Sequence, residues 1–184
     1  MIMGYEVIII GCGPAGLSAA IYLGRAKVNT LLIGKSGQSQ LAKAHKIENY
    51  FGFAQGISGR DLLNQGIQQA KKFSVNIIEK EVVQALTAEK GFSIKVETGE
   101  IHHTKALIIA TGTPIRLSGI ENEEKLTGKG VHYCVECDGP MYQGKKIAVI
   151  GNGNHAAEDA LDLVIFTKDI TIISNENGFS FSKK

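Results

Sequence analysis

A glycine-rich stretch decides the fold of this chain and reads Gly11-Cys12-Gly13-Pro14-Ala15-Gly16. Residues 5–10 before it are a short β-branched run, and residues 14–26 after it carry apolar side chains at helical spacing. Residues 28–33 are strand-like again. Strand, glycine turn, helix and strand make one βαβ unit, so we expect parallel strands with both faces of the sheet covered.

The glycine spacing of this turn, G-x-G-x-x-G, suits the binding of a nucleotide. Gly11 permits a tight bend, Gly13 lets the backbone approach a pyrophosphate, and Gly16 lets the helix pack closely on the strand. The helix N-terminus then offers N–H groups and the positive end of its dipole to the phosphates. We therefore predict a nucleotide site rather than a purely structural turn, formed by Gly11, Gly13, Pro14, Ala15 and Gly16.

The acid that binds a ribose in such folds is missing from its usual place. An Asp or Glu is expected at the end of the second strand, but residues 33–36 read Ile-Gly-Lys-Ser. Glu6 and Glu48 are the nearest acids in sequence and neither sits at the right position, so ribose recognition is unassigned. The polar, irregular residues 37–57 indicate a loop that either folds over a ligand or is simply solvated.

The middle of the chain predicts a helix followed by a small antiparallel insert. The helix begins at Gly59 and ends near residues 73–74, with its apolar side chains on one face. Short strand-like runs follow at residues 75–78, 82–86, 92–96 and toward 102. The last two predict a hairpin around Gly99.

A second βαβ unit repeats the first. Residues 145–150 predict a strand that enters another glycine turn, and residues 154–166 and 169–174 predict the helix and strand that follow. The residues of this turn that we expect to bind a nucleotide are Gly151, Gly153 and Asn154.

We therefore expect an α/β fold of two tandem Rossmann-like dinucleotide-binding domains. A buried strand at residues 105–110 ends in Thr111-Gly112, where backbone can pass close to a flat or bulky ligand. Pro114 then marks the expected boundary, between a first domain of residues 1–114 that carries the antiparallel insert and a partial second domain of residues 115–184.

Between the two units lies a pair of thiols in the stretch Cys134-Val135-Glu136-Cys137-Asp138-Gly139. A Cys-x-x-Cys near βαβ patterns indicates a redox-active pair. A carboxylate next to a thiol disfavours the thiolate, so Asp138 is better explained as a proton shuttle. His132 would give zinc only a third ligand, and no fourth Cys or His stands at a ligand spacing, so no metal is expected.

Charge and composition limit the classes of partner that we expect this chain to bind. The 20 basic and 18 acidic residues are interspersed and give a net charge of +2, so nothing resembles a footprint for nucleic acid or an anionic membrane. The apolar run near the start is far too short to span a bilayer. Three cysteines are too few for a disulfide framework. We expect a cytoplasmic protein that binds small molecules or other proteins.

In this order, the two glycine turns, the Ala110-Thr111-Gly112 exit and the Cys-x-x-Cys-Asp-Gly stretch resemble low-molecular-weight thioredoxin reductases of the FAD-dependent pyridine nucleotide-disulfide oxidoreductase family. The resemblance covers nearly the whole chain. It implies an enzyme, a thioredoxin-disulfide reductase-like oxidoreductase, whose first unit binds FAD and whose second binds a nicotinamide nucleotide. Electrons would pass through Cys134 and Cys137 to thioredoxin or a thioredoxin-like protein, and the assembly would be a homodimer.

The resemblance also assigns residues. It places Gln40 and Asn49 near the flavin, with Leu41, Thr111 and Gly112 at the cofactor, and makes Asp138 the acid that protonates a cysteine thiolate. In this chain Gln38-Ser39 precedes Gln40 where the family has two glycines.

The nicotinamide donor is left open between NADPH and NADH. Where the family has basic residues for the 2′-phosphate of NADPH, this chain has Ser174-Asn175-Glu176-Asn177. A carboxylate there repels a phosphate and suits a free ribose diol.

Because the second unit stops at Lys184 before its remaining strands, we expect a piece of a longer polypeptide or a shortened relative. Two other functions remain open: a flavin dithiol oxidoreductase with a different donor or acceptor, and a non-catalytic relative.

Overall fold

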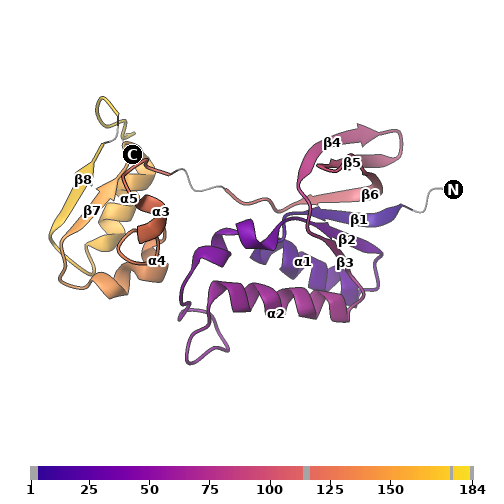
Figure 1. The fold of residues 1–184 in the computed structure, drawn as a ribbon, viewed down its shortest axis with the longest axis horizontal. Helices are drawn as coiled ribbons and strands as arrows, with labels where there is room; N and C mark the ends of the chain where they lie inside the picture. Colours follow the sequence, from indigo (N-terminus) through magenta and orange to yellow (C-terminus); the bar gives the residue numbers. More distant parts are fainter. Residues whose placement is uncertain (1–3, 114–116, 175, 183–184) are drawn as a thin grey trace. The chain divides into compact units, whose positions relative to one another are not determined.

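The computed structural model describes residues 4–113, 117–174 and 176–182. The chain divides into two compact units, residues 1–114 and residues 115–184, and each is described by itself (Figure 1). Pro114, where the sequence predicts the domain boundary, lies outside the described residues.

The first unit is built on a six-stranded mixed sheet (Figure 1). Its strands are β1 (Tyr5–Ile10), β2 (Thr30–Ile33), β3 (Asn76–Ile78), β4 (Val82–Ala88), β5 (Gly91–Val96) and β6 (Ile101–Ile109). They are ordered β3-β2-β1-β6-β5-β4. β3, β2, β1 and β6 are parallel, as the βαβ pattern predicts, while β4 and β5 are antiparallel.

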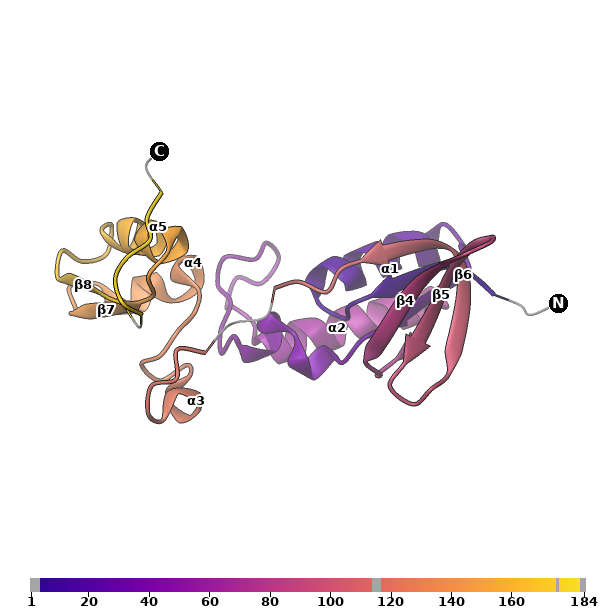
Figure 2. The same ribbon diagram turned by 90° about the horizontal axis from the view of Figure 1, so that it is seen from above.

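The predicted antiparallel insert is confirmed, and it extends the parallel sheet instead of forming one of its own. The strand-like runs expected near residue 102 and at 105–110 are one strand, β6. The beginning of β6 pairs with β5, and the rest pairs with β1 from Thr104 onward. Figure 2 shows β4, β5 and β6 running side by side.

Both faces of β1 and β2 are covered, whereas the prediction of a buried strand at residues 105–110 is wrong, because Lys105, Ala106 and Ile109 of β6 are exposed. Helices α1 (Pro14–Arg25) and α2 (Gly59–Lys72) lie on one face, where Ile9 and Leu32 join the helical core. On the opposite face Ile8 and Leu31 pack with Ile94 of the antiparallel insert. Successive side chains of a strand point to opposite faces, which is why neighbouring residues enter different cores.

The polar loop of residues 37–57 is partly ordered into two short 3₁₀ helices, η1 (Ser36–Gln38) and η2 (Gln40–Lys43). Ser39 stands between them, and its hydroxyl accepts a hydrogen bond from the Leu41 N–H at 3.3 Å. The serine therefore caps η2 through its side chain.

The second unit contains one βαβ element, with β7 (Ile147–Ile150), α5 (Asn154–Leu163) and β8 (Ile170–Ile173). The two strands are parallel. Three short helices precede them: α3 (Glu123–Leu126), α4 (Val135–Asp138) and η3 (Gly139–Tyr142). The helix predicted to reach residue 166 ends at Leu163, because the hydrogen bonds from Val164 and Phe166 reach only three residues back.

Within the described residues, no helix is both long and apolar enough to cross a membrane.

Candidate functional site

The first glycine turn has the geometry that its spacing predicts. Gly11 has a φ of +114°, and its N–H donates to the carbonyl oxygen of Ile33 at 2.8 Å, which ties the turn to the end of β2. A side chain at Gly16 would overlap the Gly11 carbonyl oxygen, so α1 can begin this close to β1 only with glycine there. Gly13 caps α1 and has no side chain to accept from the first-turn N–H groups, which leaves them for a ligand.

Gln40 meets the loop that follows β6. Its Nε2 donates to the carbonyl oxygen of Thr113 at 3.0 Å, although the two residues are 73 positions apart. Its Oε1 is buried and has no hydrogen-bond partner among the described residues. Thr111 and Gly112 of the same loop are exposed, and nothing lies within 4 Å of where a Gly112 side chain would begin. The result is an unpaired acceptor beside an open stretch of backbone, which a ligand N–H group could satisfy.

The other two loop residues assigned by the resemblance lie differently. Leu41 packs against the helical core, and its carbonyl oxygen occupies the space that a side chain at Gly59 would need. Asn49 is exposed, in the segment closed by the bridge between Ile47 and Ile57. Among the described residues, no contact joins the Asn49 side chain to the rest of this site.

Glu79 is an acid near the first turn that the sequence interpretation missed. It directly follows β3, and its carboxylate accepts a hydrogen bond from the Ser36 hydroxyl at 2.8 Å. Burial raises the pKa of the Cys12 thiol to about 11, and the second cause is the negative charge of Glu79. The signal was available, because β3 is the parallel neighbour of β2 and the carboxyl ends of parallel strands share one edge of a sheet.

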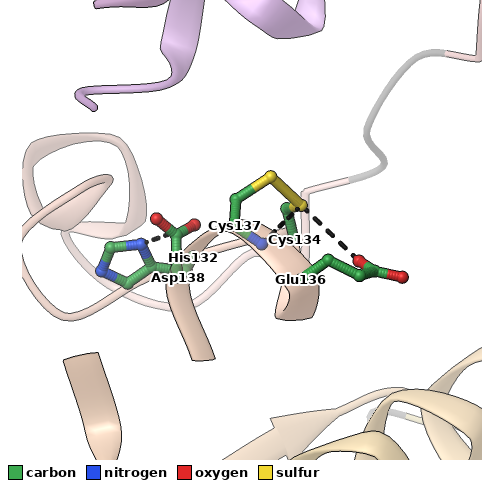
Figure 3. The surroundings of a disulfide bond; sticks show 5 residues. All are labelled: His132, Cys134, Glu136, Cys137 and Asp138. Carbon is green, nitrogen blue, oxygen red and sulfur yellow. Dashed lines mark hydrogen bonds and ion pairs between the residues drawn. A yellow bond between two sulfur atoms is a disulfide. The ribbon is translucent and has the colours of Figure 1, made fainter. Parts of the chain in front are cut away.

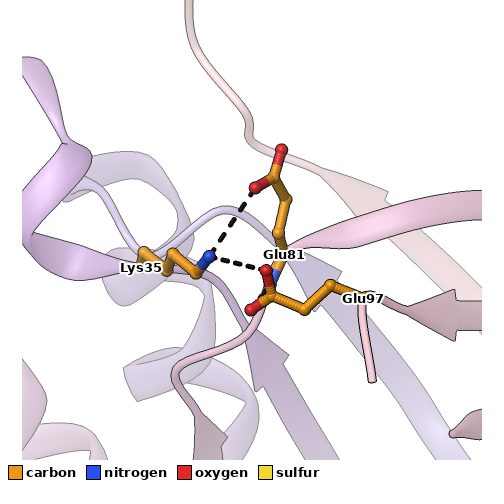
Figure 4. Close-up of polar contacts among 3 residues, drawn as sticks. All are labelled: Lys35, Glu81 and Glu97. Carbon is orange, nitrogen blue, oxygen red and sulfur yellow. Dashed lines mark hydrogen bonds and ion pairs between the residues drawn. The ribbon is translucent and has the colours of Figure 1, made fainter. Parts of the chain in front are cut away.

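Lys35, at the place where an acid was expected, is held by two glutamates (Figure 4). Its ammonium lies 2.7 Å from the Glu97 carboxylate and 3.6 Å from that of Glu81. The hydrogen bond to Glu97 is the main cause of a raised pKa for Lys35, and the same bond lowers the pKa of Glu97. The ion pairs of Lys35 with Glu97 and Glu81 join the end of β2 to the antiparallel strands, and the carboxylates balance the charge of the lysine.

The second glycine turn repeats the first in detail. Gly151 has a φ of +158°, and its N–H donates to the carbonyl oxygen of Ile173 at 2.9 Å, the counterpart of the bond from Gly11 to Ile33. Gly153 caps α5 with extended backbone, as Gly13 caps α1. The third glycine of the first turn is replaced here by Ala156.

Residues 176–182 lie against this second turn. The Asn152 side chain donates to the Glu176 carboxylate at 2.6 Å, and the Ser180 N–H donates to the Asn152 carbonyl oxygen at 2.7 Å. The Ser182 N–H donates to Asn154 Oδ1 at 2.7 Å. A carboxylate and two side-chain amides therefore stand at the nucleotide-type turn. Asn175 lies outside the described residues.

The two thiols of the Cys-x-x-Cys stretch form a disulfide, with their Cα atoms 5.3 Å apart (Figure 3). The Cys137 N–H donates to Cys134 Sγ at 3.2 Å, and Glu136 Oε2 lies 3.6 Å from the same sulfur. A disulfide sulfur carries no hydrogen, so the Glu136 contact is a nearby charge and no hydrogen bond in this state. Cys137 is exposed and Cys134 half-buried. Within the described part of the chain, no group of three His, Cys, Asp or Glu side chains could hold a metal.

Asp138, directly behind the disulfide, pairs with His132 (Figure 3). His132 Nδ1 lies 3.0 Å from Asp138 Oδ2, and both side chains are largely shielded from solvent. The rings of His132 and Tyr142 contact each other in a T-shaped arrangement, with centroids 5.3 Å apart. The sequence interpretation considered His132 only as a third zinc ligand, expected no metal there, and did not foresee its contact with Asp138.

Glu123 anchors the segment that leads to the thiols. Its buried carboxylate accepts hydrogen bonds from the N–H groups of Ser118 and Gly119, at 3.0 and 2.8 Å, and from the Tyr133 hydroxyl at 3.0 Å. These bonds, the Ser118 N–H first, lower the pKa of Glu123. Tyr133 precedes Cys134, so the carboxylate fixes where the dithiol segment starts.

Comparison with known proteins agrees with these features. Residues 5–183 match the family described as pyridine nucleotide-disulphide oxidoreductase. The chain is 42% identical over 169 residues to the 34.2 kDa protein in the rubredoxin operon of Clostridium pasteurianum, covering 91% of this chain and 54% of that protein. It is 38% identical over 180 residues to the thioredoxin reductase of Mycolicibacterium smegmatis, covering 97% and 58%.

A solved thioredoxin reductase from Giardia duodenalis has the same fold, with a TM-score of 0.88, 31% identity and coverage of 97% of this chain and 58% of that one. The chain spans between 39% and 58% of the length of the first curated relatives that it matches. The resemblance inferred from the glycine turns and the dithiol is confirmed. The chain belongs to the pyridine nucleotide-disulphide oxidoreductase family and is similar to its thioredoxin reductases.

Proposed function

We propose that the protein containing this chain is a flavin-dependent disulfide reductase. Electrons pass from a reduced nicotinamide through FAD to the Cys134/Cys137 pair, and from there to thioredoxin or a thioredoxin-like protein. The observation that carries the proposal is the disulfide with Asp138 directly behind it, in a chain whose two glycine turns share one geometry. A dithiol that receives electrons from cofactors at two nucleotide sites fits an enzyme that transfers electrons to sulfur.

The first unit fits FAD on several counts. Among the residues that the structure describes, the N-terminus of α1 has no side-chain cap and the buried Oε1 of Gln40 has no donor. The turn also has no room for side chains at Gly11 and Gly16. We assign the pyrophosphate to Gly11, Gly13, Pro14, Ala15 and Gly16, and the flavin to Gln40, Leu41, Asn49, Thr111 and Gly112. When bound, FAD supplies the two-electron chemistry that reduces a disulfide.

Glu79 supplies the missing ribose acid in this proposal. Its carboxylate already accepts a hydroxyl hydrogen bond, from Ser36, and its charge reaches Cys12 inside the glycine turn. Both contacts place it at the edge of the sheet where ribose hydroxyls would donate to it. Glu79 directly follows β3, whereas the ribose acid of such folds usually stands at the end of the second strand, here β2.

The cysteines and Asp138 perform the exchange. One cysteine thiolate attacks the disulfide of the partner, forming a mixed disulfide, and the partner sulfur that leaves takes a proton from Asp138. The second cysteine thiol then returns a proton to Asp138 and attacks the mixed disulfide, which re-forms the Cys134–Cys137 bond. The second partner sulfur takes that proton, so the partner gains two electrons and two protons and leaves as a dithiol.

The second unit favours NADH as the nicotinamide donor. The carboxylate of Glu176 accepts a hydrogen bond from the side chain of Asn152. Asn152 belongs to the turn of Gly151, Gly153 and Asn154 that we assign to the nucleotide. A carboxylate accepts hydrogen bonds from a free ribose diol and repels the 2′-phosphate of NADPH. Replacement of Glu176 by Arg should therefore raise the affinity for NADPH and lower that for NADH.

Spectroscopy with thiol counting tests the proposal. The purified protein should show a flavin absorption spectrum that bleaches anaerobically at lower NADH than NADPH concentrations. In denaturant, the count of free thiols should rise by two after reduction, as the Cys134–Cys137 disulfide opens. Cys134→Ser should abolish disulfide reduction while leaving the flavin spectrum intact.

Other outcomes select the rival functions. A protein without flavin is the non-catalytic relative. Flavin that is reduced by neither nicotinamide, or a reduced dithiol that ignores thioredoxin, indicates another donor or acceptor. Bleaching at lower NADPH than NADH would contradict the role given to Glu176.

We also propose a cytoplasmic location and a homodimeric assembly. A chain that combines a reactive dithiol in one unit with a free, buried cysteine in the other suits a reducing compartment. The homodimer follows from the resemblance to thioredoxin reductases, and light scattering of the purified protein measures it.

A further inference from the structure

A histidine stands behind the redox-active pair in an arrangement that the exchange chemistry above does not use. His132 Nδ1 lies 3.0 Å from Asp138 Oδ2, and the exposed fractions of the two side chains are 14% and 25%. The other ring nitrogen, Nε2, is buried and has no hydrogen-bond partner among the described residues. Figure 3 shows the imidazole on the side of Asp138 away from the disulfide.

The geometry selects one tautomer of the imidazole. A carboxylate accepts hydrogen bonds and donates none, so the proton belongs on Nδ1, facing Asp138. A buried N–H without an acceptor is less favourable than a buried lone pair on the same atom, which leaves Nε2 unprotonated. His132 therefore presents an N–H from Nδ1 to the carboxylate.

We propose that His132 is a positioning residue for Asp138 in thiol–disulfide exchange, an inference that rests on the function proposed above. After Asp138 has given its proton to the leaving sulfur, it becomes a partly buried carboxylate beside the sulfur atoms. The Nδ1–H of His132 donates to that carboxylate, fixes its rotamer and stabilises its charge. The histidine itself gains and loses no proton, so the balance of two electrons and two protons is unchanged.

The surroundings support this division of roles. Tyr142, the other polar group against the His132 ring, has a raised pKa, first because of burial and then because of the Asp138 charge, so its phenol stays protonated. Glu136 lies beside Cys134 Sγ, before the second cysteine, and has no hydrogen bond or ion pair with His132 among the described residues. Asp138, held by His132, is thus the acid placed directly after the disulfide.

Two kinds of disulfide separate positioning from a general structural role. The protein is reduced chemically, freed of reductant, and mixed with an alkyl disulfide such as oxidised glutathione or with an aromatic disulfide such as dithiobis-nitrobenzoate. An alkyl thiolate is a basic leaving group that needs a proton, whereas the aromatic thiolate leaves readily without one. Neither reaction requires flavin or nicotinamide.

The variants are His132→Leu, which lacks a donor, and His132→Asn, whose amide can place an N–H near the position of Nδ1. His132→Leu should slow exchange with the alkyl disulfide about tenfold and leave the aromatic reaction within about twofold, because only the first depends on the acid. His132→Asn should recover most of the rate. In Asp138→Asn the change at His132 should have no further effect, since the histidine acts through the carboxylate.

Equal slowing of both disulfides in His132→Leu, or no slowing of the alkyl one, overturns the proposal. If His132→Leu does not fold, His132→Gln replaces it, because its longer side chain cannot keep the amide at the Nδ1 position. A wild-type dithiol that exchanges with neither disulfide overturns the proposed function and this inference with it. Loss of flavin binding or of nicotinamide reduction, with exchange intact, overturns the proposed function alone.

Discussion

The two glycine turns of this chain share a backbone geometry and differ in almost everything around it. Both have a left-handed first glycine whose N–H donates to the end of the next strand, and both use glycine to cap a helix. Around the first turn every residue of β2 is buried, while in β8 two of four residues are exposed. The third glycine is kept in the first turn and replaced by Ala156 in the second. One local motif therefore stands in two surroundings that differ in burial.

The largest difference should appear at the third position of the turns. Gly16→Val should destabilise the first unit by more than about 3 kcal/mol and abolish FAD binding, because the side chain would overlap the Gly11 carbonyl oxygen. The matched change Ala156→Gly should cost only about 1 kcal/mol through helix propensity. Denaturant unfolding and flavin retention measure both. Similar losses in the two variants would mean that the turns are equally tight.

The second-largest difference should appear in the cost of substitutions in the strands that follow the two turns, β2 and β8. Ile33→Ala should cost about 3 kcal/mol, because Ile33 is fully buried in β2. Ile173, at the matching place in β8, is 47% exposed, and its change to Ala should cost less than about 1 kcal/mol. Hydrogen exchange of each strand reports the two effects separately. If Ile173→Ala proves as costly as Ile33→Ala, the difference in burial between β2 and β8 does not set the two costs.

A third comparison is between two neighbouring acids of the first unit, Glu79, which we assign to the FAD ribose, and Glu81. Glu79→Gln should weaken FAD binding about tenfold, the size expected for one hydrogen bond to a charged group. Binding of FMN, which lacks the adenosine ribose, should be unchanged. Glu81→Gln, which removes a carboxylate from the Lys35 cluster nearby, is the matched control. Fluorescence titration of the apoprotein measures all three. Equal FAD affinity in Glu79→Gln and wild type would remove Glu79 from the site.

The smallest effect concerns the second unit at low pH. Glu123 has a pKa below its unfolded value of about 4.3, so its carboxylate stabilises the fold above that pH. This contribution disappears as the pH falls through the lower folded-state pKa. Glu123→Gln should therefore be less stable than wild type at pH 7, and the gap should shrink as the pH drops below about 4.

Urea unfolding at a series of pH values measures this gap, with Glu124→Gln, an exposed neighbour, as the control. A gap that stays constant through the acid range would show that the carboxylate charge is not what holds the segment before Cys134.

The elements of the fold were largely predictable because their signals are local. The helices at Pro14 and Gly59 and the parallel strands follow from side-chain periodicity and glycine turns, and the structure has them within a few residues. The errors fall at element ends. The helix after the second turn stops at Leu163, and β6 absorbs a run that had been taken as a separate strand, since strand pairing decides where a strand ends.

The residues of the candidate site likewise divide into those that local sequence signals predicted and those that they did not. A redox-active pair at Cys134 and Cys137 was expected from the Cys-x-x-Cys motif near βαβ patterns, and the structure joins the two residues in a disulfide. Glu79 was missed because the sequence points to the end of β2, whereas the structure brings an acid from β3 to that edge. The partnership of His132 with Asp138 has no periodic signal at all.

By itself the sequence determined two βαβ units, two nucleotide-type turns and a dithiol followed by an acid, since each depends on conformational limits and spacings within a few residues. Only the tertiary structure decided which side chains complete those sites. It joined Gln40 to Thr113, Glu79 to Ser36 and residues 176–182 to the second turn. Such contacts depend on strand order and on chain crossings, which bring together residues whose separation along the chain carries no information about their distance in space.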